Sequence, residues 1–220
     1  LLDFLRDAAA WRRSRPYFLL TLGVIVLDQV TKLVVKLNMD YGEEIPALGD
    51  WFSIYFIENK GAAFGMTLTN ILPFLGDTAA KFILSLFSLI AACFIGYFLI
   101  SVSHLRTGLP VVLAVVLGGA LGNIIDRIFY GLWFQEINNY EGGLFYGRVV
   151  DFLFVETPHG YLPDWVPFWG GDYLPPFPVF NVADCAISVG IIVMLVFQHK
   201  FFKEEPRPGK QEAEGTTVEQ

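Results

Sequence analysis

The sequence predicts an all-α polytopic membrane protein, and three observations lead to that fold class. Hydrophobic residues make up 54% of the 220 residues, charged residues only 17%, and the mean hydropathy is +0.51. Four apolar runs are each about as long as the roughly 20 residues that a helix needs to cross a bilayer core. Clusters of Lys and Arg lie between and beyond these runs. This composition excludes an ordinary soluble domain, and the net charge of −7 gives no reason to expect nucleic-acid binding.

The four predicted spans are residues 17–37, 81–102, 109–130 and 179–199. We expect them to form a single four-helix transmembrane domain over residues 1–203. The tail that follows, residues 204–220, is charged and nearly free of apolar residues, so we expect it to be disordered and dispensable for chemistry.

The basic residues predict the orientation of the spans, because Lys and Arg are enriched on the cytoplasmic side of a membrane. They precede the first span, occupy the second connection and follow the fourth span, at Arg6, Arg12, Arg13, Arg15, Arg106, Lys200, Lys203, Arg207 and Lys210. We therefore expect both termini in the cytoplasm and the long connections 38–80 and 131–178 on the outer side. Those connections contain tryptophans that suit a membrane interface: Trp51, Trp133, Trp165 and Trp169.

Polar side chains inside or beside the spans are candidate functional groups, because an ionisable residue in a membrane is energetically unfavourable. The candidates within spans are Asp28, Lys32, Asn123, Asp126, Arg127, Asn181 and Asp184. Asp151 lies in the outer connection, within an apolar segment, 149–154, that we expect to turn back toward the membrane. In the predicted orientation most of these groups lie at one depth, near the outer face, which favours a single site.

Each candidate also has a purely structural interpretation. Asp28 and Lys32 are spaced i, i+4 and could form an intrahelical ion pair. Asn181 could cap the fourth helix through the amide of Asp184, whose carboxylate the helix dipole would favour. Three others could be interfacial or solvated residues: Asp126, Arg127 and Asp151.

Two aspartates that lie close together could act as a general acid and a general base. Neighbouring carboxyls share a proton, so one can activate water while the other supports the developing oxyanion and the leaving nitrogen. The histidines, His104, His159 and His199, lie away from the polar cluster, which argues against a serine–histidine–acid triad. No zinc-ligand spacing is present, and we interpret Cys93 and Cys185 as core residues. The chemistry favours an aspartic hydrolase without a metal or cofactor.

Five short polar segments follow one another along the chain. They are Asp28-Gln29-Val30-Thr31-Lys32, Asn59-Lys60-Gly61-Ala62-Ala63-Phe64-Gly65, Gly118-Gly119-Ala120-Leu121-Gly122-Asn123-Ile124-Ile125-Asp126-Arg127, Val149-Val150-Asp151-Phe152 and Phe180-Asn181-Val182-Ala183-Asp184. In this order they resemble the motifs of the lipoprotein signal peptidases, also called signal peptidase II. The resemblance covers about residues 28–190.

The resemblance implies that Asp151 and Asp184 are the catalytic pair, with Asp126 as the rival for the second position. It also implies a set of supporting residues: Asp28, Lys32, Asn59, Gly61, Asn123, Asp126, Arg127, Asn181 and Ala183. Within this set we expect Arg127 and Asn59 to contact the substrate backbone, and Asn123 and Asp126 to orient the site. Gly61, Ala62 and Ala63 are small enough for a substrate or an acyl chain to lie against the backbone, although they could simply form a turn.

The family resemblance further implies a substrate, a location and an inhibitor. The substrate would be a diacylglyceryl-modified prolipoprotein cut just before the lipidated cysteine, in the inner membrane of a bacterium. The active site would lie near the outer face, below a small extracytoplasmic β-sheet cradle. We expect a monomer in contact with membrane lipid and inhibited by the cyclic peptide globomycin.

Two features leave other interpretations open. The connections 127–149 and 154–177 are longer than the family resemblance leads us to expect, and we interpret them as extra outer-face structure, either a lid or a segment resting on the membrane. A transporter or channel subunit would also carry ionisable residues within its spans, but it would distribute them across the membrane depth. A non-catalytic assembly factor would leave the aspartates replaceable.

Overall fold

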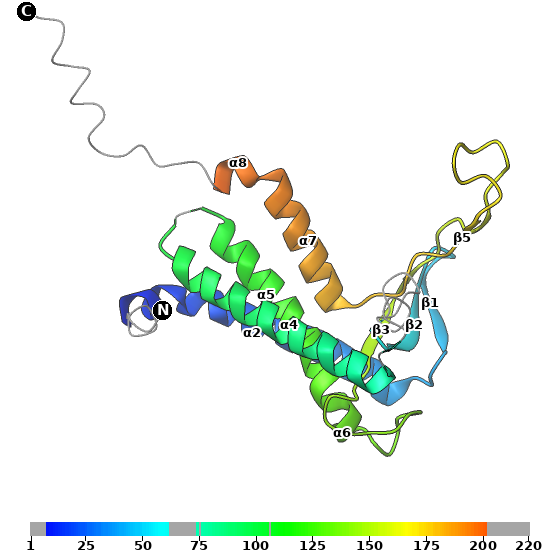
Figure 1. Cartoon of the computed structure of the whole chain (residues 1–220), viewed down its shortest axis with the longest axis horizontal. Helices are drawn as coiled ribbons and strands as arrows, with labels where there is room; N and C mark the ends of the chain where they lie inside the picture. Colours follow the sequence, from blue (N-terminus) through cyan, green and yellow to red (C-terminus); the bar gives the residue numbers. More distant parts are fainter. Residues whose placement is uncertain (1–7, 62–73, 75, 106, 202–220) are drawn as a thin grey trace, which may run out of the picture.

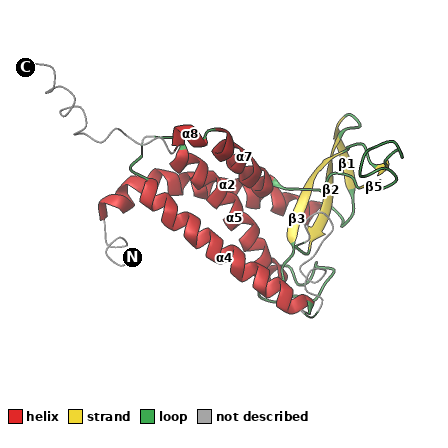
Figure 2. Cartoon of the chain, turned by 45° about the horizontal axis from the view of Figure 1, so that its top comes forward, coloured by secondary structure: helices red, strands yellow, loops and turns green. Residues whose placement is uncertain are grey.

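The computed structural model describes residues 8–61, 74, 76–105 and 107–201. Its helices are α2 (Ala8–Asn38), α4 (Asp77–Val102), α5 (Leu109–Ile125), α6 (Gly131–Trp133), α7 (Val182–Val196) and α8 (Gln198–Phe201), and a π-helical turn, η1 (Asp126–Tyr130), joins α5 to α6. The strands are β1 (Glu44–Leu48), β2 (Phe52–Asn59), β3 (Val149–Val155), β4 (Gly160–Tyr161) and β5 (Tyr173–Leu174). The helices form a bundle, and the sheet lies beyond one end of it (Figure 1 and Figure 2).

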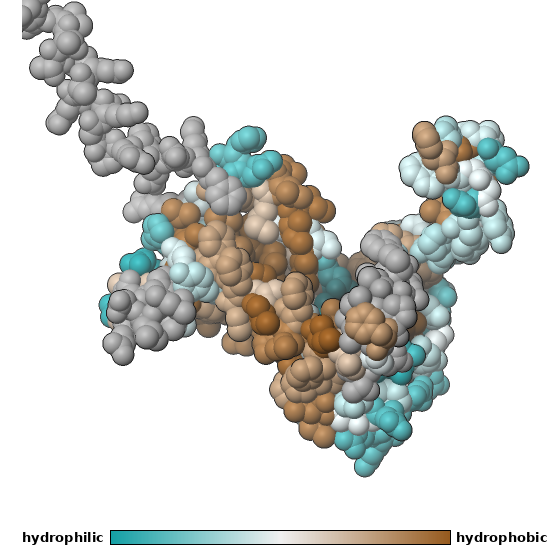
Figure 3. All heavy atoms as spheres, viewed as in Figure 1, coloured by the Kyte–Doolittle hydropathy of each residue, from teal (hydrophilic) through white to brown (hydrophobic). Residues whose placement is uncertain are grey.

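Helix α5 occupies the centre of the bundle, because it packs against α2, α4 and α7. In its most apolar stretch 67% of the residues are buried, against 22% in the corresponding stretches of α2 and α4. The outer helices instead expose large apolar side chains such as Leu19, Phe87 and Leu195. Figure 3 shows the resulting apolar surface over the helices. This distribution is that of a bundle whose outer faces contact lipid.

Within the described part of the chain, three helical segments are long and apolar enough to cross a membrane: Ala8–Asn38, Ala79–Val102 and Leu109–Trp133. They correspond to the first three predicted spans. Helix α7 has 15 residues, which extend about 22 Å and fall short of a bilayer core about 30 Å thick. The predicted fourth helix over 179–199 is therefore shorter than expected: Asn181 caps it at its start, and the chain leaves the helix at Phe197 before α8. A fourth complete span stays a prediction.

Strands β1, β2 and β3 form an antiparallel sheet in that order. The apolar segment 149–154, whose secondary structure was not predicted from the sequence, lies in strand β3, and its return toward the membrane stays a prediction. Its backbone pairs with β2 on one side, and Leu153 forms a bridge with Phe180 on the other. Asp151 and its apolar neighbours Val149, Val150 and Phe152 are all buried in β3.

The sheet is fixed to the bundle by a small apolar core. Buried residues from α2, the sheet and η1 pack together: Val35, Phe56, Tyr130, Val150 and Phe152. Beside this core Lys36 of α2 forms a buried ion pair with Glu58 of β2 and donates a hydrogen bond to Oδ1 of Asn138 at 2.8 Å. The sheet therefore has a defined position relative to the helices.

Several predictions concern residues outside the described part of the chain. These are the turn or contact surface at Ala62 and Ala63, the disordered tail 204–220, and the basic residues Arg6, Arg106, Lys203, Arg207 and Lys210.

Candidate active site

Strand β3 places Asp151 at a buried position, where the residue is only 2% exposed. Its Oδ1 accepts a hydrogen bond from Nδ2 of Asn181 at 2.6 Å, and its Oδ2 accepts one from Nδ2 of Asn59 at 3.0 Å. Asn59 ends β2 and pairs with Val149, two residues before Asp151. The two side chains are therefore diagonal neighbours on the same face of the sheet, and the strand register brings the amide to the carboxylate.

The environment of Asp151 favours its protonated form. Burial raises the pKa of this carboxyl to about 7, and the negative charge of Asp184 acts in the same direction. The hydrogen bonds from Asn59 and Asn181 oppose this effect, because they stabilise the carboxylate, as does the positive charge of Lys32. Asp151 can therefore hold a proton close to neutral pH.

The first turn of α7 fixes Asp184 by a reciprocal cap. Oδ1 of Asn181 accepts a hydrogen bond from the backbone N–H of Asp184 at 2.9 Å, and the backbone N–H of Asn181 donates to Oδ2 of Asp184 at 3.2 Å. The predicted cap is thus confirmed. The other carboxylate oxygen of Asp184 accepts a hydrogen bond from Nδ2 of Asn123 on α5 at 2.9 Å. Both oxygens of Asp184 are held, so the side chain has a defined orientation.

Asn181 connects the two aspartates. Its Oδ1 caps the helix that carries Asp184, while its Nδ2 donates to Asp151 and also lies 3.3 Å from the backbone oxygen of Val150 and from Oδ1 of Asn123. The residue is fully buried. One side chain therefore combines the structural role of a cap with the positioning of both carboxylates.

Asp151 and Asp184 line the same cavity, of about 500 Å³. Polar and apolar residues share its wall: Asn59, Gly61, Asn123, Arg127, Leu84, Val149, Phe177, Pro178, Val179, Phe180, Ile187 and Ser188. A larger cavity of about 620 Å³ lies at the end of α2, around Lys36 and Glu58. Its buried carboxylate, Glu58, is neutralised by the ion pair with Lys36. We therefore assign the chemistry to the smaller cavity, which contains two carboxylates held by amides.

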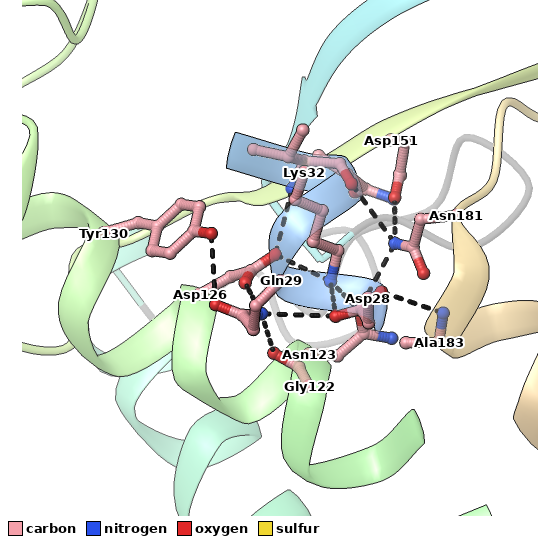
Figure 4. Close-up of polar contacts among 12 residues, drawn as sticks. Asp28, Gln29, Lys32, Gly122, Asn123, Asp126, Tyr130, Asp151, Asn181 and Ala183 are labelled. Carbon is pink, nitrogen blue, oxygen red and sulfur yellow. Dashed lines mark hydrogen bonds and ion pairs between the residues drawn. The ribbon is translucent and has the colours of Figure 1, made fainter. Parts of the chain in front are cut away.

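Lys32 is the centre of a buried charged cluster behind this cavity (Figure 4). Its Nζ lies 2.8 Å from Oδ2 of Asp28 and 2.9 Å from Oδ2 of Asp126, and it donates to Oδ1 of Asn123 at 2.9 Å. The predicted intrahelical pair is confirmed, and Asp126 is a second anionic partner. Because Lys32 binds the oxygen of the Asn123 amide, the NH₂ group of that amide faces Asp184. Lys32 thus fixes the orientation of the Asn123 amide and, through it, of the Asp184 side chain.

Asp28 joins three helices at this point. Its Oδ1 accepts a hydrogen bond from the backbone N–H of Ala183 at 2.9 Å, one of the donors that the start of a helix leaves unpaired. Its Oδ2 lies so close to α5 that a Cβ atom on Gly122 would be 2.5 Å away. Only glycine at position 122 leaves room for the carboxylate. Helix α7, which carries Asp184, is therefore fixed to α2 by a buried charge-assisted bond.

The structural alternative of an interfacial position does not hold for Asp126, and Arg127 lines the cavity. Asp126 is fully buried in the Lys32 cluster, and its Oδ2 also accepts a hydrogen bond from the backbone N–H of Val150 at 3.2 Å. Arg127 lines the cavity, and its Nη1 donates to Oγ of Ser88 at 2.9 Å. Its buried Nε has no hydrogen-bond partner in the described part of the chain.

The model of a known family, described as signal peptidase (SPase) II, matches residues 20–200 of this chain. The chain belongs to the signal peptidase II family. A lipoprotein signal peptidase from Porphyromonas gingivalis is 37% identical over 187 residues, which cover 79% of this chain and 78% of the relative. The relative from Chlorobium phaeobacteroides is 33% identical over 84% of this chain and 97% of its own length.

Solved structures resemble this signal peptidase II chain along most of its length. A structure described as a bacterial membrane enzyme at 1.9 Å resolution shares 25% of its sequence with this chain and superposes with a TM-score of 0.56, over 86% of this chain and 94% of that one. A second, at 2.3 Å, gives a TM-score of 0.55. Membership of a peptidase family favours a protease over the transporter and assembly-factor alternatives.

The site residues predicted from the sequence converge in space. Those that contact the cavity are Asp151, Asp184, Asn59, Gly61, Asn123 and Arg127. Those that lie behind it and orient the cavity residues are Asp28, Lys32, Asp126, Asn181 and Ala183. Among the described residues, no group of three or more His, Cys, Asp or Glu side chains is arranged to hold a metal.

The sequence interpretation missed Gln29 and Lys36. Nε2 of Gln29 donates to Oδ1 of Asp126 at 2.9 Å, and its Oε1 accepts from the hydroxyl of Tyr130 at 3.1 Å. Lys36 repeats the i, i+4 spacing of Asp28 and Lys32 on the same face of α2. Both residues are polar groups within an apolar run, and that signal would have found them.

Proposed function

We propose that this protein is an aspartic endopeptidase that removes the signal peptide from diacylglyceryl-modified prolipoproteins, cutting just before the lipidated cysteine. The observation that carries the proposal is the pair Asp151 and Asp184, which line one cavity and are held by the single side chain of Asn181. The lipoprotein signal peptidases among its relatives supply the substrate class. The apolar part of the cavity wall suits a substrate that approaches from a bilayer.

The two carboxyls would have different roles. Asp151 would begin the reaction protonated, because burial and the nearby charge of Asp184 raise its pKa to about 7. Asp184 would serve as the general base.

In the proposed reaction Asp184 takes a proton from water, and the water oxygen forms a bond to the scissile carbonyl carbon. The carbonyl oxygen becomes an alkoxide and receives the proton of Asp151. When the tetrahedral intermediate collapses, the C–N bond breaks, the leaving nitrogen takes the proton held by Asp184, and a hydroxyl proton returns to Asp151. The side chains of the pair end in their starting states.

Arg127 would position the substrate. Its guanidinium lines the cavity and has a buried Nε–H without a partner in the described residues, so it can donate to a peptide carbonyl. A second cavity of about 200 Å³ lies beside it, lined mainly by apolar residues of α4, α5 and α7. Gly61, whose φ is +93°, contributes backbone to the wall of the main cavity. Together these features fit an extended peptide next to apolar groups.

The finer features of location follow from the basic residues and remain part of the proposal. The protein would lie in the inner membrane with both termini in the cytoplasm, a fourth span formed by α7 and α8, and the cavity near the outer face, below the sheet. It would act as a monomer and be inhibited by globomycin.

The test is cleavage of a purified diacylglyceryl-modified prolipoprotein, followed by gel shift, by the wild type and by Asp151→Asn, Asp184→Asn and Asp126→Asn. Each variant is checked for folding in detergent. We expect the first two to be folded and to lose at least about a thousandfold in kcat. We expect Asp126→Asn to lower the stability but to retain turnover, because Asp126 lies behind the cavity with Lys32.

Near-normal cleavage by both Asp151→Asn and Asp184→Asn would overturn the catalytic assignment. A folded Asp126→Asn protein as inactive as these two would place Asp126 in the chemical step. Failure of the folded wild type to cut any lipidated prolipoprotein would overturn the substrate class.

A further inference from the structure

Residues 156–178 form an arm that leaves strand β3 and returns to Phe180. Its base is fixed: the backbone N–H of Glu156 donates to the oxygen of Trp51 at 2.9 Å, and Phe180 exchanges backbone hydrogen bonds with Leu153. Strands β4 and β5 pair along its stem. Figure 1 shows the arm projecting from the sheet, away from the helices and roughly across the direction in which α2 and α4 run.

The tip of the arm is a defined loop. The backbone N–H of Gly170 donates to the oxygen of Val166 at 2.9 Å, and that of Asp172 donates to the oxygen of Trp169 at 3.1 Å. Phe168 adopts a left-handed backbone conformation, with φ of +70°, which is unfavourable for an aromatic residue. The tip therefore has a defined backbone conformation, closed by its own hydrogen bonds.

Large aromatic side chains of the tip are mostly exposed. Trp165 is 80% exposed, Phe168 is 96% exposed and Trp169 is 63% exposed. Figure 3 shows the tip standing clear of the rest of the surface, with apolar residues beside polar ones. An exposed aromatic cluster of this kind is typical of a surface that contacts a membrane or another protein.

The direction of the arm relative to the helices indicates how the arm would lie against a membrane. Its return strand leads directly to Asn181, the cap of α7, and α7 exposes the apolar residues Val189 and Leu195 along its length. The base of the arm thus lies at the level where an apolar helix begins. Because the arm runs across the helix direction, it extends along the plane of a membrane that the helices cross. Tryptophan and other aromatic residues partition to the boundary between headgroups and acyl chains.

Charge excludes one kind of lipid attraction. Between residues 156 and 178 the charged residues are Glu156, Asp164 and Asp172, and there is no Lys or Arg. Attraction to anionic headgroups therefore cannot drive the contact. The exposed aromatic and aliphatic side chains are the groups of the arm suited to bind a bilayer, and zwitterionic lipid would suffice.

We propose that the tip of the arm, residues 164–169, rests in the headgroup–acyl boundary of the bilayer. Phe177, at the root of the arm, lines the cavity that contains Asp151 and Asp184. The arm thereby fixes the mouth of this cavity relative to the lipid surface. The lipid contact itself does not depend on catalysis, so it can be tested without substrate.

The test uses the full chain in phosphatidylcholine nanodiscs, with a fluorescent label at the tip. The label is attached through Pro167→Cys in a background of Cys93→Ala and Cys185→Ala. We expect acyl chains brominated near the headgroup to quench the label more strongly than chains brominated near their ends, because interfacial segments lie about 5–10 Å deep. Iodide in the water should quench it weakly, and added phosphatidylglycerol should not strengthen the contact.

Matched variants identify the groups that make the contact. The variant Trp165→Ser, Phe168→Ser, Trp169→Ser should lose quenching by bromine and gain quenching by iodide. The variant Trp165→Phe, Trp169→Phe keeps aromatic side chains and should behave like the parent.

Three results would overturn the proposal. The label could be open to iodide and insensitive to bromine in the parent protein, which would place the tip in water. Protection could appear only with two copies in one disc, which would make a second copy the partner. It could also appear only after addition of a prolipoprotein, which would make the arm a binding surface for the substrate.

Discussion

Removing the side-chain amide of Asn59, one of two amides that donate to Asp151, should shift the pH dependence of kcat/KM in a predictable direction. The carboxylate of Asp151 accepts one hydrogen bond from Asn181 at 2.6 Å and one from Asn59 at 3.0 Å. Both bonds favour the ionised form. In Asn59→Ala one of them is lost, so the pKa of Asp151 should rise above its value of about 7.

The size of the change follows from the strength of the lost bond. A hydrogen bond to a charged group contributes about 1.5–3 kcal/mol, and the longer bond from Asn59 belongs at the lower end. Since 1.36 kcal/mol corresponds to one pH unit, the pKa should rise by about one, to about 8. On the proposed mechanism activity needs protonated Asp151, so kcat/KM falls as pH rises through this pKa. At about pH 8 the variant should retain about half of its own maximum, against about a tenth for the wild type.

The assay is kcat/KM for a diacylglyceryl-modified prolipoprotein in mixed micelles, from about pH 5 to about pH 9. Asn38→Ala serves as the control, because its side chain bonds to Val34 on exposed helix surface away from the catalytic cavity. An Asn59→Ala profile whose basic limb coincides with that of the wild type, whatever its maximum, would refute the proposed role of Asp151 as the acid. A limb that moves to lower pH would reverse the sign of the effect and refute it as well.

The cluster behind the cavity gives two predictions about stability. Gly122→Ala places a methyl group 2.5 Å from Oδ2 of Asp28 and should lower the free energy of unfolding in detergent by about 1–3 kcal/mol. The control Gly23→Ala, with no atom within 4 Å of the new Cβ, should change this free energy little. Equal effects of the two substitutions would contradict the close fit at Gly122. Lys32→Met leaves the carboxylates of Asp28 and Asp126 buried without their cation, and should cost about 3–5 kcal/mol in the same assay, unless Asp126→Asn is added to remove one charge.

Local patterns in the sequence predicted the helices well and the turns between them poorly. The first three spans appeared as apolar runs because each helix carries apolar residues both on the side packed in the bundle and on the side that faces lipid. The π-helical turn at 126–130 was not predicted, because its widened hydrogen bonding leaves no mark in the apolar period. The secondary structure of strand β3 was not predicted, since six residues of mainly apolar character do not reveal whether another strand lies beside them.

The members of the site could be predicted, but their mutual arrangement could not. Polar residues stand out in an apolar run, so Asp28, Lys32 and Asp184 were found directly. Their partners depend on helix packing: Lys32 meets Asp126 across α2 and α5, although 94 positions separate them in the chain. For the same reason the sequence could not show that Asp126 is buried behind the cavity with Lys32, a position that argues against its role as a catalytic residue.

The placement of Asn181 and Asp184 in the last apolar helix has a consequence for biogenesis. A ribosome delivers α2, α4, α5 and β3 before α7, so a nascent or truncated chain possesses Asp151 without its partner and without the amide that positions it. On the proposed mechanism such a chain has no proteolytic competence. Activity would appear only when synthesis is nearly finished, and incomplete products in the membrane would be harmless to bystander proteins.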